Sequence, residues 1–265
     1  MPAAPSSFVL TASPSMPAQP GLERAVRELL GDVEVSWQET AAGRGTLSVD
    51  ELRVDVELRP CQVPNAEADT AAFLSLSAVR DDWRLPKHGA HLTLTRREGR
   101  VLVKPTGLLG RVMGSARPAT AVESLSRFTK VVAAVTRAVE AVGVYWGAAP
   151  VTHQPGFFVD LARETEVPIP LWLGVSITPE ADGRVQVLSL GMGQLGLPDL
   201  LLAAPKKDPG DVLDFFFSTL TVLAEQGTPF PEGYTVSRSL LERLTVRYGP
   251  SPLDPQQRVF KLDLP

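Results

Sequence analysis

Cysteine is almost absent from this chain, since Cys61 is the only one among 265 residues. A lone cysteine forms neither an intrachain disulfide nor a thiolate metal cluster. Secreted proteins of this size often carry paired cysteines, so the composition favours a reducing compartment. We interpret Cys61 as a small apolar side chain that fills space beside the end of a strand.

We also expect neither a secretory leader nor a membrane-spanning run in this chain. Its first residues contain no basic cluster and no long apolar stretch. A helix that crosses a bilayer needs roughly 18 apolar residues in succession. The longest candidate, 131–144, is interrupted by Arg137 and Glu140. We therefore expect a cytoplasmic protein without a membrane partner.

Positive charge is in the minority, with 26 Lys and Arg against 30 Asp and Glu, which gives a formal net charge of −4. Nucleic acid binding normally needs a basic groove or stripe. The densest basic stretch holds Arg96, Arg97, Arg100 and Lys104, and Glu98 interrupts it. This pattern is typical of a solvated hairpin, so we expect no nucleic acid partner.

Side chains that could carry catalysis or bind a metal are few. The chain has no G-x-S-x-G elbow, no Walker loop and only three histidines. His88 and His91 lie near the start of a predicted strand and would point to opposite faces, whereas zinc needs converging ligands. We interpret His88 and His153 as loop residues and His91 as partly buried against a sheet. A pairing of Cys61 with a histidine has no local support, and we predict neither a metal site nor catalytic residues.

Gly191, Gly193 and Gly196 fit the dinucleotide pattern G-x-G-x-x-G after a predicted strand, and Asp211 lies at a suitable distance downstream. The context does not suit a nucleotide site. Pro198 stands where a helix should present its N-terminus to a pyrophosphate, and 200–203 indicates another strand. We predict a glycine-supported turn and no cofactor.

Hydrophobic periodicity indicates short helices and strands in both halves of the chain. Apolar residues at helical spacing predict helices, and alternating apolar residues predict strands. The helices are expected at 21–30, 66–77, 121–142, 157–166 and 208–226, and the strands at 8–10, 33–37, 52–58, 91–95, 144–146, 171–178, 184–190, 200–203, 244–248 and 258–264. Without regular βα repeats, this order predicts an α+β fold of mixed, mainly antiparallel sheets packed with helices.

The predicted domain organisation has an N-terminal half at 1–104, a connection at 105–118 and a C-terminal half at 119–265. The first half reads β-α-β-β-α-β, which suits a ferredoxin-like sheet. A fold of two ferredoxin-like halves is one arrangement within this class, and the pattern leaves open whether the halves are one domain or two.

Four aromatic residues could line a ligand pocket or pack in the core: Trp83, Tyr145, Trp146 and Trp172. Each lies at or near an apolar element, and large aromatic side chains dominate protein cores. We therefore predict that they belong to the core.

Several short motifs resemble successive blocks of the bacterial domain-of-unknown-function family 4261. They are VYWG at 144–147, FFVD at 157–160, PLWL at 170–173, LGM at 190–192, LGLPDL at 195–200 and ERLTVRY at 242–248. The resemblance extends from about Trp83 onwards and is weaker before it. It implies a strand-turn-strand crossover around Gly191, and it implies no established activity, so no catalytic residue is carried over.

These observations favour a non-catalytic protein-binding module, such as a bacterial immunity or antitoxin protein that occludes a toxin. One alternative is an accessory or structural component of a secretion machine or another assembly. A second is an enzyme whose site is assembled from scattered residues. Because loops carry function more freely than buried strands, we expect the contact surface at 60–70, 99–118 and 249–257.

Overall fold

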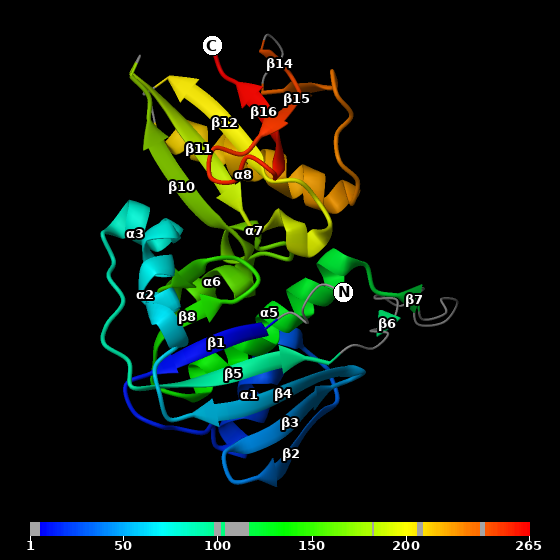
Figure 1. Cartoon of the computed structure of the whole chain (residues 1–265). Helices are drawn as coiled ribbons and strands as arrows, with labels where there is room; N and C mark the ends of the chain where they lie inside the picture. Colours follow the sequence, from blue (N-terminus) through cyan, green and yellow to red (C-terminus); the bar gives the residue numbers. More distant parts are fainter. Residues whose placement is uncertain (1–5, 98–101, 104–116, 182, 206–208, 239–241) are drawn as a thin grey trace.

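The computed structural model describes residues 6–97, 102–103, 117–181, 183–205, 209–238 and 242–265 (Figure 1). It contains a seven-stranded sheet and a five-stranded sheet, with helices packed against both. All pairings in the first sheet are antiparallel, and the second has one parallel pair. The predicted α+β class with mixed, mainly antiparallel sheets is confirmed.

The seven-stranded sheet has the order β2-β3-β4-β5-β1-β8-β9. Its strands are β1 (Ser6–Thr11), β2 (Val35–Ala41), β3 (Arg44–Val49), β4 (Leu52–Arg59), β5 (Ala90–Arg96), β8 (Ala141–Trp146) and β9 (Val151–His153). No strand was predicted at 44–49, where the structure has β3, because the two glycines at 43 and 45 are typical of a turn. Only Gly43 turns the chain, with φ of 72°. Gly45 lies under Trp37, where an added Cβ would overlap the indole.

Helices α1 (Gln19–Leu30) and α5 (Ala121–Ala138) pack against each other and cover one face of this sheet. A capping box formed by Thr120 and Glu123 begins α5. The helix was predicted to continue to residue 142 but ends at Ala138. The residues that follow, rich in Val and aromatic side chains, pair with β1 as β8 instead.

A chain of short helical pieces covers part of the other face. It consists of η1 (Pro64–Ala66), α2 (Glu67–Ala71), η2 (Ala72–Leu74) and α3 (Leu76–Asp81), and α2 and η2 pack on β9. A continuous helix was predicted at 66–77. It is interrupted because Ser75 has an extended backbone, and its hydroxyl accepts the N–H of Ser77 to begin α3.

The five-stranded sheet has the order β10-β11-β12-β16-β15. Its strands are β10 (Gly174–Pro179), β11 (Arg184–Leu190), β12 (Leu200–Pro205), β15 (Arg247–Pro250) and β16 (Arg258–Asp263). Helix α8 (Pro209–Gln226) packs on β12, and α7 (Ile169–Trp172) contacts α8 and β9. Helix α6 (Pro155–Glu164) packs on α5 and on β8 of the first sheet. Residues 171–172, predicted to begin a strand, belong to α7. Two small ladders pair β13 (Thr235–Ser237) with β14 (Arg243–Thr245), and β6 (Leu102–Val103) with β7 (Arg117–Pro118).

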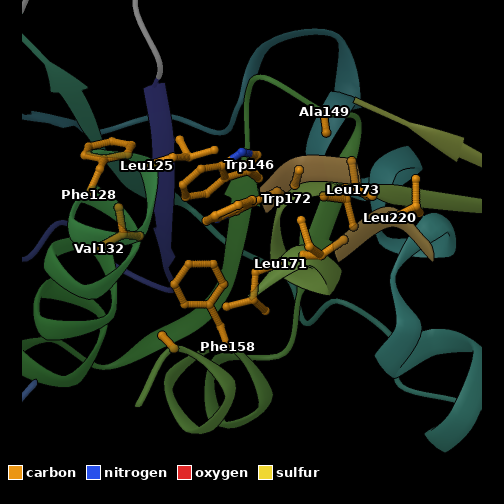
Figure 2. Packing of buried hydrophobic residues seen from close by; sticks show 14 of the residues in the cluster. Leu125, Phe128, Val132, Trp146, Ala149, Phe158, Leu171, Trp172, Leu173 and Leu220 are labelled. Atoms are coloured by element: carbon orange, nitrogen blue, oxygen red, sulfur yellow. The ribbon is translucent and has the colours of Figure 1, made fainter. Parts of the chain in front are cut away.

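The strand pairing does not follow the division predicted at 105–118. Strands β8 and β9 come from the segment assigned to the C-terminal half, yet they complete the sheet of the N-terminal half. This is not an arrangement of two ferredoxin-like halves. One continuous cluster of buried apolar side chains runs from Val9 to Leu264 and joins the two sheets, and Figure 2 shows Trp146 and Trp172 within it.

Candidate functional site

The glycine motif forms a turn, and the first two amide groups of this turn are already occupied. Gly191 and Gly196 have φ of 130° and 71°, and residues 192–195 form the short helix η3 (Met192–Leu195). One oxygen of the Asp199 carboxylate accepts the backbone N–H groups of Gly191 and Met192, both at 3.1 Å. A phosphate would need these same donors. The predicted glycine-supported turn is therefore confirmed. The downstream Asp211 lies in the first turn of α8, where it pairs with Arg238.

Asp199 ties four parts of the five-stranded sheet together. Besides the two amides, its carboxylate accepts the hydroxyl of Ser189 at 2.8 Å and the amide of Gln257 at 3.1 Å. Burial raises the pKa of the Asp199 carboxyl above its usual value, and the hydrogen bonds oppose this rise. In the sequence, Asp199 stands out only as part of the LGLPDL motif at 195–200. Its role depends on the return of Gln257, nearly sixty residues later, which no local pattern reveals.

His88 and His91 converge on the segment that follows β4. The N–H of Val63 donates to Nε2 of His88 at 3.5 Å, and Nδ1 of His91 donates to the carbonyl of Cys61 at 2.8 Å. His88 lies in a loop, as predicted, but it is buried there, as is His91 in β5. Cys61 does not fill space beside the strand end: it is exposed, and His91 holds the segment through the Cys61 carbonyl.

These two histidines act as anchors for the segment 61–63. Burial lowers the pKa of His91, and the hydrogen bond to Cys61 opposes this change. Within the described residues, no three side chains of His, Cys, Asp or Glu come together as metal ligands would. In the same part of the chain, no helix is long and apolar enough to cross a bilayer.

His153 pairs with a serine, but deep inside the protein. It lies in β9, not in the predicted loop. Its Nε2 donates to the carbonyl of Leu171, and the hydroxyl of Ser75 lies 3.1 Å from Nδ1. The rings of Phe157 and Phe158 lie about the imidazole, with centroids 5.9 and 5.8 Å away. A catalytic serine must meet its substrate, and both side chains here are fully buried. The pair joins α3, β9 and α7.

The buried His153 predicts a loss of stability in acid. Burial lowers its pKa from 6.5 to about 4. The folded state therefore binds this proton less tightly than the unfolded state. The resulting stabilisation is fully present above pH 6.5 and is lost as the pH falls through about 4. At 1.36 kcal/mol per pKa unit, it amounts to about 3 kcal/mol. Urea unfolding of wild type and His153→Asn at a series of pH values measures it.

The variant is expected to be less stable than wild type at pH 7, and its stability is expected to fall less steeply between pH 6.5 and 4. His91 titrates in the same direction, so some slope should remain. Equal slopes in the two proteins would contradict the assignment of a neutral, buried His153.

The predicted aromatic residues divide between the core and its margin. Trp146 and Trp172 are fully buried, as Figure 2 shows, and each indole N–H has a partner: Gln194 for Trp146 and Thr129 for Trp172. Tyr145 is buried on the outer face of the first sheet beside Phe8. Trp83 is only half-buried. The prediction that these residues belong to the core is confirmed for Trp146, Trp172 and Tyr145.

A group of exposed apolar side chains remains on the surface. Phe73 on η2 is 64% exposed and Val79 on α3 is 42% exposed, and these two elements contact each other. The guanidinium of Arg84 lies over the Phe73 ring, 5.7 Å from its centroid. We call Phe73, Val79 and Arg84 the Phe73 surface. Sequence reasoning missed it, because helical spacing alone does not say which apolar residues stay uncovered.

The Phe73 surface differs from the contact segments that the sequence predicted. Of those, 60–70 is anchored by the histidines, and 249–257 by the bond from Gln257 to Asp199. Leu253 within the latter is exposed. The segment 99–118 lies almost entirely outside the described residues.

Comparison with known proteins found no match to this chain among protein-family models, curated proteins or solved structures. The resemblance to family 4261 therefore stays a prediction.

Proposed function

We propose that this chain is a non-catalytic protein-binding module that makes contact through the Phe73 surface. The exposed phenyl ring of Phe73, with an arginine stacked on it, is the observation that carries the proposal. Aromatic residues and arginine are enriched at the centres of protein interfaces. Single exposed apolar residues are ordinary, whereas grouped ones mark contact sites.

The polar groups also favour binding over catalysis. In the described part of the chain, His91, His153 and Asp199 are each engaged by groups of the chain itself, which hold segments together. An enzyme with a scattered site is the weaker alternative, because a reacting group needs an accessible atom.

A bacterial immunity or antitoxin protein in the cytoplasm is our more specific proposal. Its support is the family resemblance and the net charge of −4, which would speed association with a basic toxin at low salt. An accessory component of a secretion machine or another assembly is the alternative. A toxin gene beside the gene for this chain would favour the first, and secretion genes would favour the second.

The double variant Phe73→Ser and Val79→Ser tests the proposed surface. Both side chains are exposed, so each change should alter the free energy of unfolding by no more than about 0.5 kcal/mol. Loss of a central aromatic contact should cost at least about 2 kcal/mol of binding, or about thirtyfold in affinity. Pull-downs from the native host, followed by affinity measurement on the protein recovered, provide the readout.

Val222→Ser on α8 is the matched control, since Val222 is as exposed but lies on another helix. Wild type and control should recover the same protein, and the double variant should not. Equal recovery by all three would overturn the proposed surface.

A further inference from the structure

The four outer strands of the two large sheets differ in how they are protected. β9 is buried beneath α2 and η2. β2 carries Glu39 and β15 carries Arg247, and β15, like β10, ends on a proline. Charge, proline and cover are the usual means by which proteins protect a sheet edge from pairing. β10 has the sequence GVSITP, which contains no charged residue and only a terminal proline.

Strand β10 is also exposed where it could pair. In the described part of the chain it forms a ladder with β11 alone. Gly174 and Val175 are buried, but the strand becomes exposed from Ile177 onwards, and Ile177 itself is 41% exposed. The outer strand of an antiparallel sheet presents a row of N–H and C=O groups on its free side. Such a row is complementary to another extended backbone.

The Phe73 surface adjoins this strand. Element η2, which carries Phe73, contacts β10. The Cβ of Leu74 lies 3.3 Å from the position that a Cβ on Gly174 would take. A segment paired with β10 would therefore reach the surface that we propose for partner contact.

We propose that β10 binds an extended, uncharged segment of the partner protein as an added strand. The proposal rests on the proposed function and specifies its mode of contact. The main chain of the segment would pair with β10, as in other cases of strand addition. Because β10 has no charge to balance, apolar and hydroxyl side chains suit the positions opposite Val175 to Thr178.

Size favours a short segment over a second copy of this chain. β10 has six residues, so the pair would be about 20 Å long and about 5 Å wide. Stable dimers bury about 1,200–2,000 Å², far more than such a strip provides. A peptide strand needs no more than this edge and the side chains beside it.

The probe for this proposal is a capped hexapeptide of alternating valine and threonine with a polar tail. Its control is the same peptide N-methylated at alternate residues, which removes the pairing N–H groups and keeps the side-chain pattern. The full chain is used, and binding is followed by fluorescence anisotropy and by hydrogen exchange of the β10 amides. The unmodified peptide should bind and slow exchange at β10, and the N-methylated peptide should bind at least about tenfold more weakly.

The variant Ile177→Lys places a charge on the edge, as natural edge strands do. It should weaken peptide binding at least about tenfold, whereas Gln38→Lys on the exposed strand β2 should leave it unchanged. Equal binding of the two peptides would overturn the proposal whether or not the lysine variant folds. Equal binding by Ile177→Lys, with unchanged thermal melting, would also overturn it. A wild-type dimer that Ile177→Lys converts to a monomer would assign the edge to a second copy instead.

The two proposals can fail separately. If Phe73→Ser with Val79→Ser loses the partner and Ile177→Lys keeps it, the protein-binding function stands and strand addition is overturned. If wild type recovers no protein from its host, the proposed function fails, and the peptide comparison still decides the chemistry of β10.

Discussion

Replacing Trp146 by alanine is expected to lower the free energy of unfolding by about 3–5 kcal/mol. The indole is fully buried, with the rings of Phe128 and Phe158 at centroid distances of 5.6 and 6.2 Å. Its N–H donates to Gln194 at 2.9 Å, so the change also removes a hydrogen bond next to the glycine turn. A cavity of this size cannot close without moving both sheets, because the cluster is continuous between them.

Urea unfolding monitored by circular dichroism measures the loss. Trp83→Ala is the control, because Trp83 is half-buried at the margin of the fold, and a smaller loss is expected there. If Trp146→Ala unfolds at the same urea concentration as wild type, Trp146 has no role in the core, and a role in ligand binding returns for it.

Replacing Asp199 by alanine is expected to cost about 3 kcal/mol. The change leaves the N–H groups of Gly191 and Met192 without their acceptor, along with the hydroxyl of Ser189. A buried donor without a partner costs about 1–3 kcal/mol, and water can reach some of these groups. Asp199→Asn keeps the size and one acceptor oxygen, so its loss should be smaller.

Thermal and urea unfolding of the two variants measure how much Asp199 contributes to the free energy of unfolding. Hydrogen exchange at Gly191 and Met192 adds a local measurement, since both amides should exchange faster in Asp199→Ala. A melting temperature equal to that of wild type, with unchanged exchange at these amides, would contradict the anchoring role.

Much of the secondary structure could be predicted from the sequence, because local periodicity determines it. Helices α1 and α8 lie within two residues of the predicted ranges, and β11 has the bounds predicted for it. A helix with one apolar stripe has one way to face a core. The end of α5 was less predictable, because the residues of β8, which follow Ala138, pair with β1 instead of extending the helix.

The candidate site depends on contacts that no local pattern contains. His88 is a loop residue as predicted, but its burial depends on the segment after β4, which lies across it. Phe73 and Leu74 are adjacent and both apolar, yet only one packs against Gly174. Which of two neighbours stays exposed is determined by tertiary packing and not by propensity. Sequence reasoning could limit the classes of function, but it could not find this surface.

The position of β1 in the middle of the first sheet also affects how the protein is made. β1 ends at Thr11, whereas one of its two neighbours, β8, begins only at Ala141. At the usual rate of translation, roughly ten seconds separate the synthesis of these two strands. Throughout this interval, the side of β1 that pairs with β8 has no partner strand. Strands so distant in sequence also pair slowly once both are present. The ribosome-bound chain is therefore most vulnerable to aggregation before β8 leaves the exit tunnel, when chaperones that bind nascent chains would protect it most.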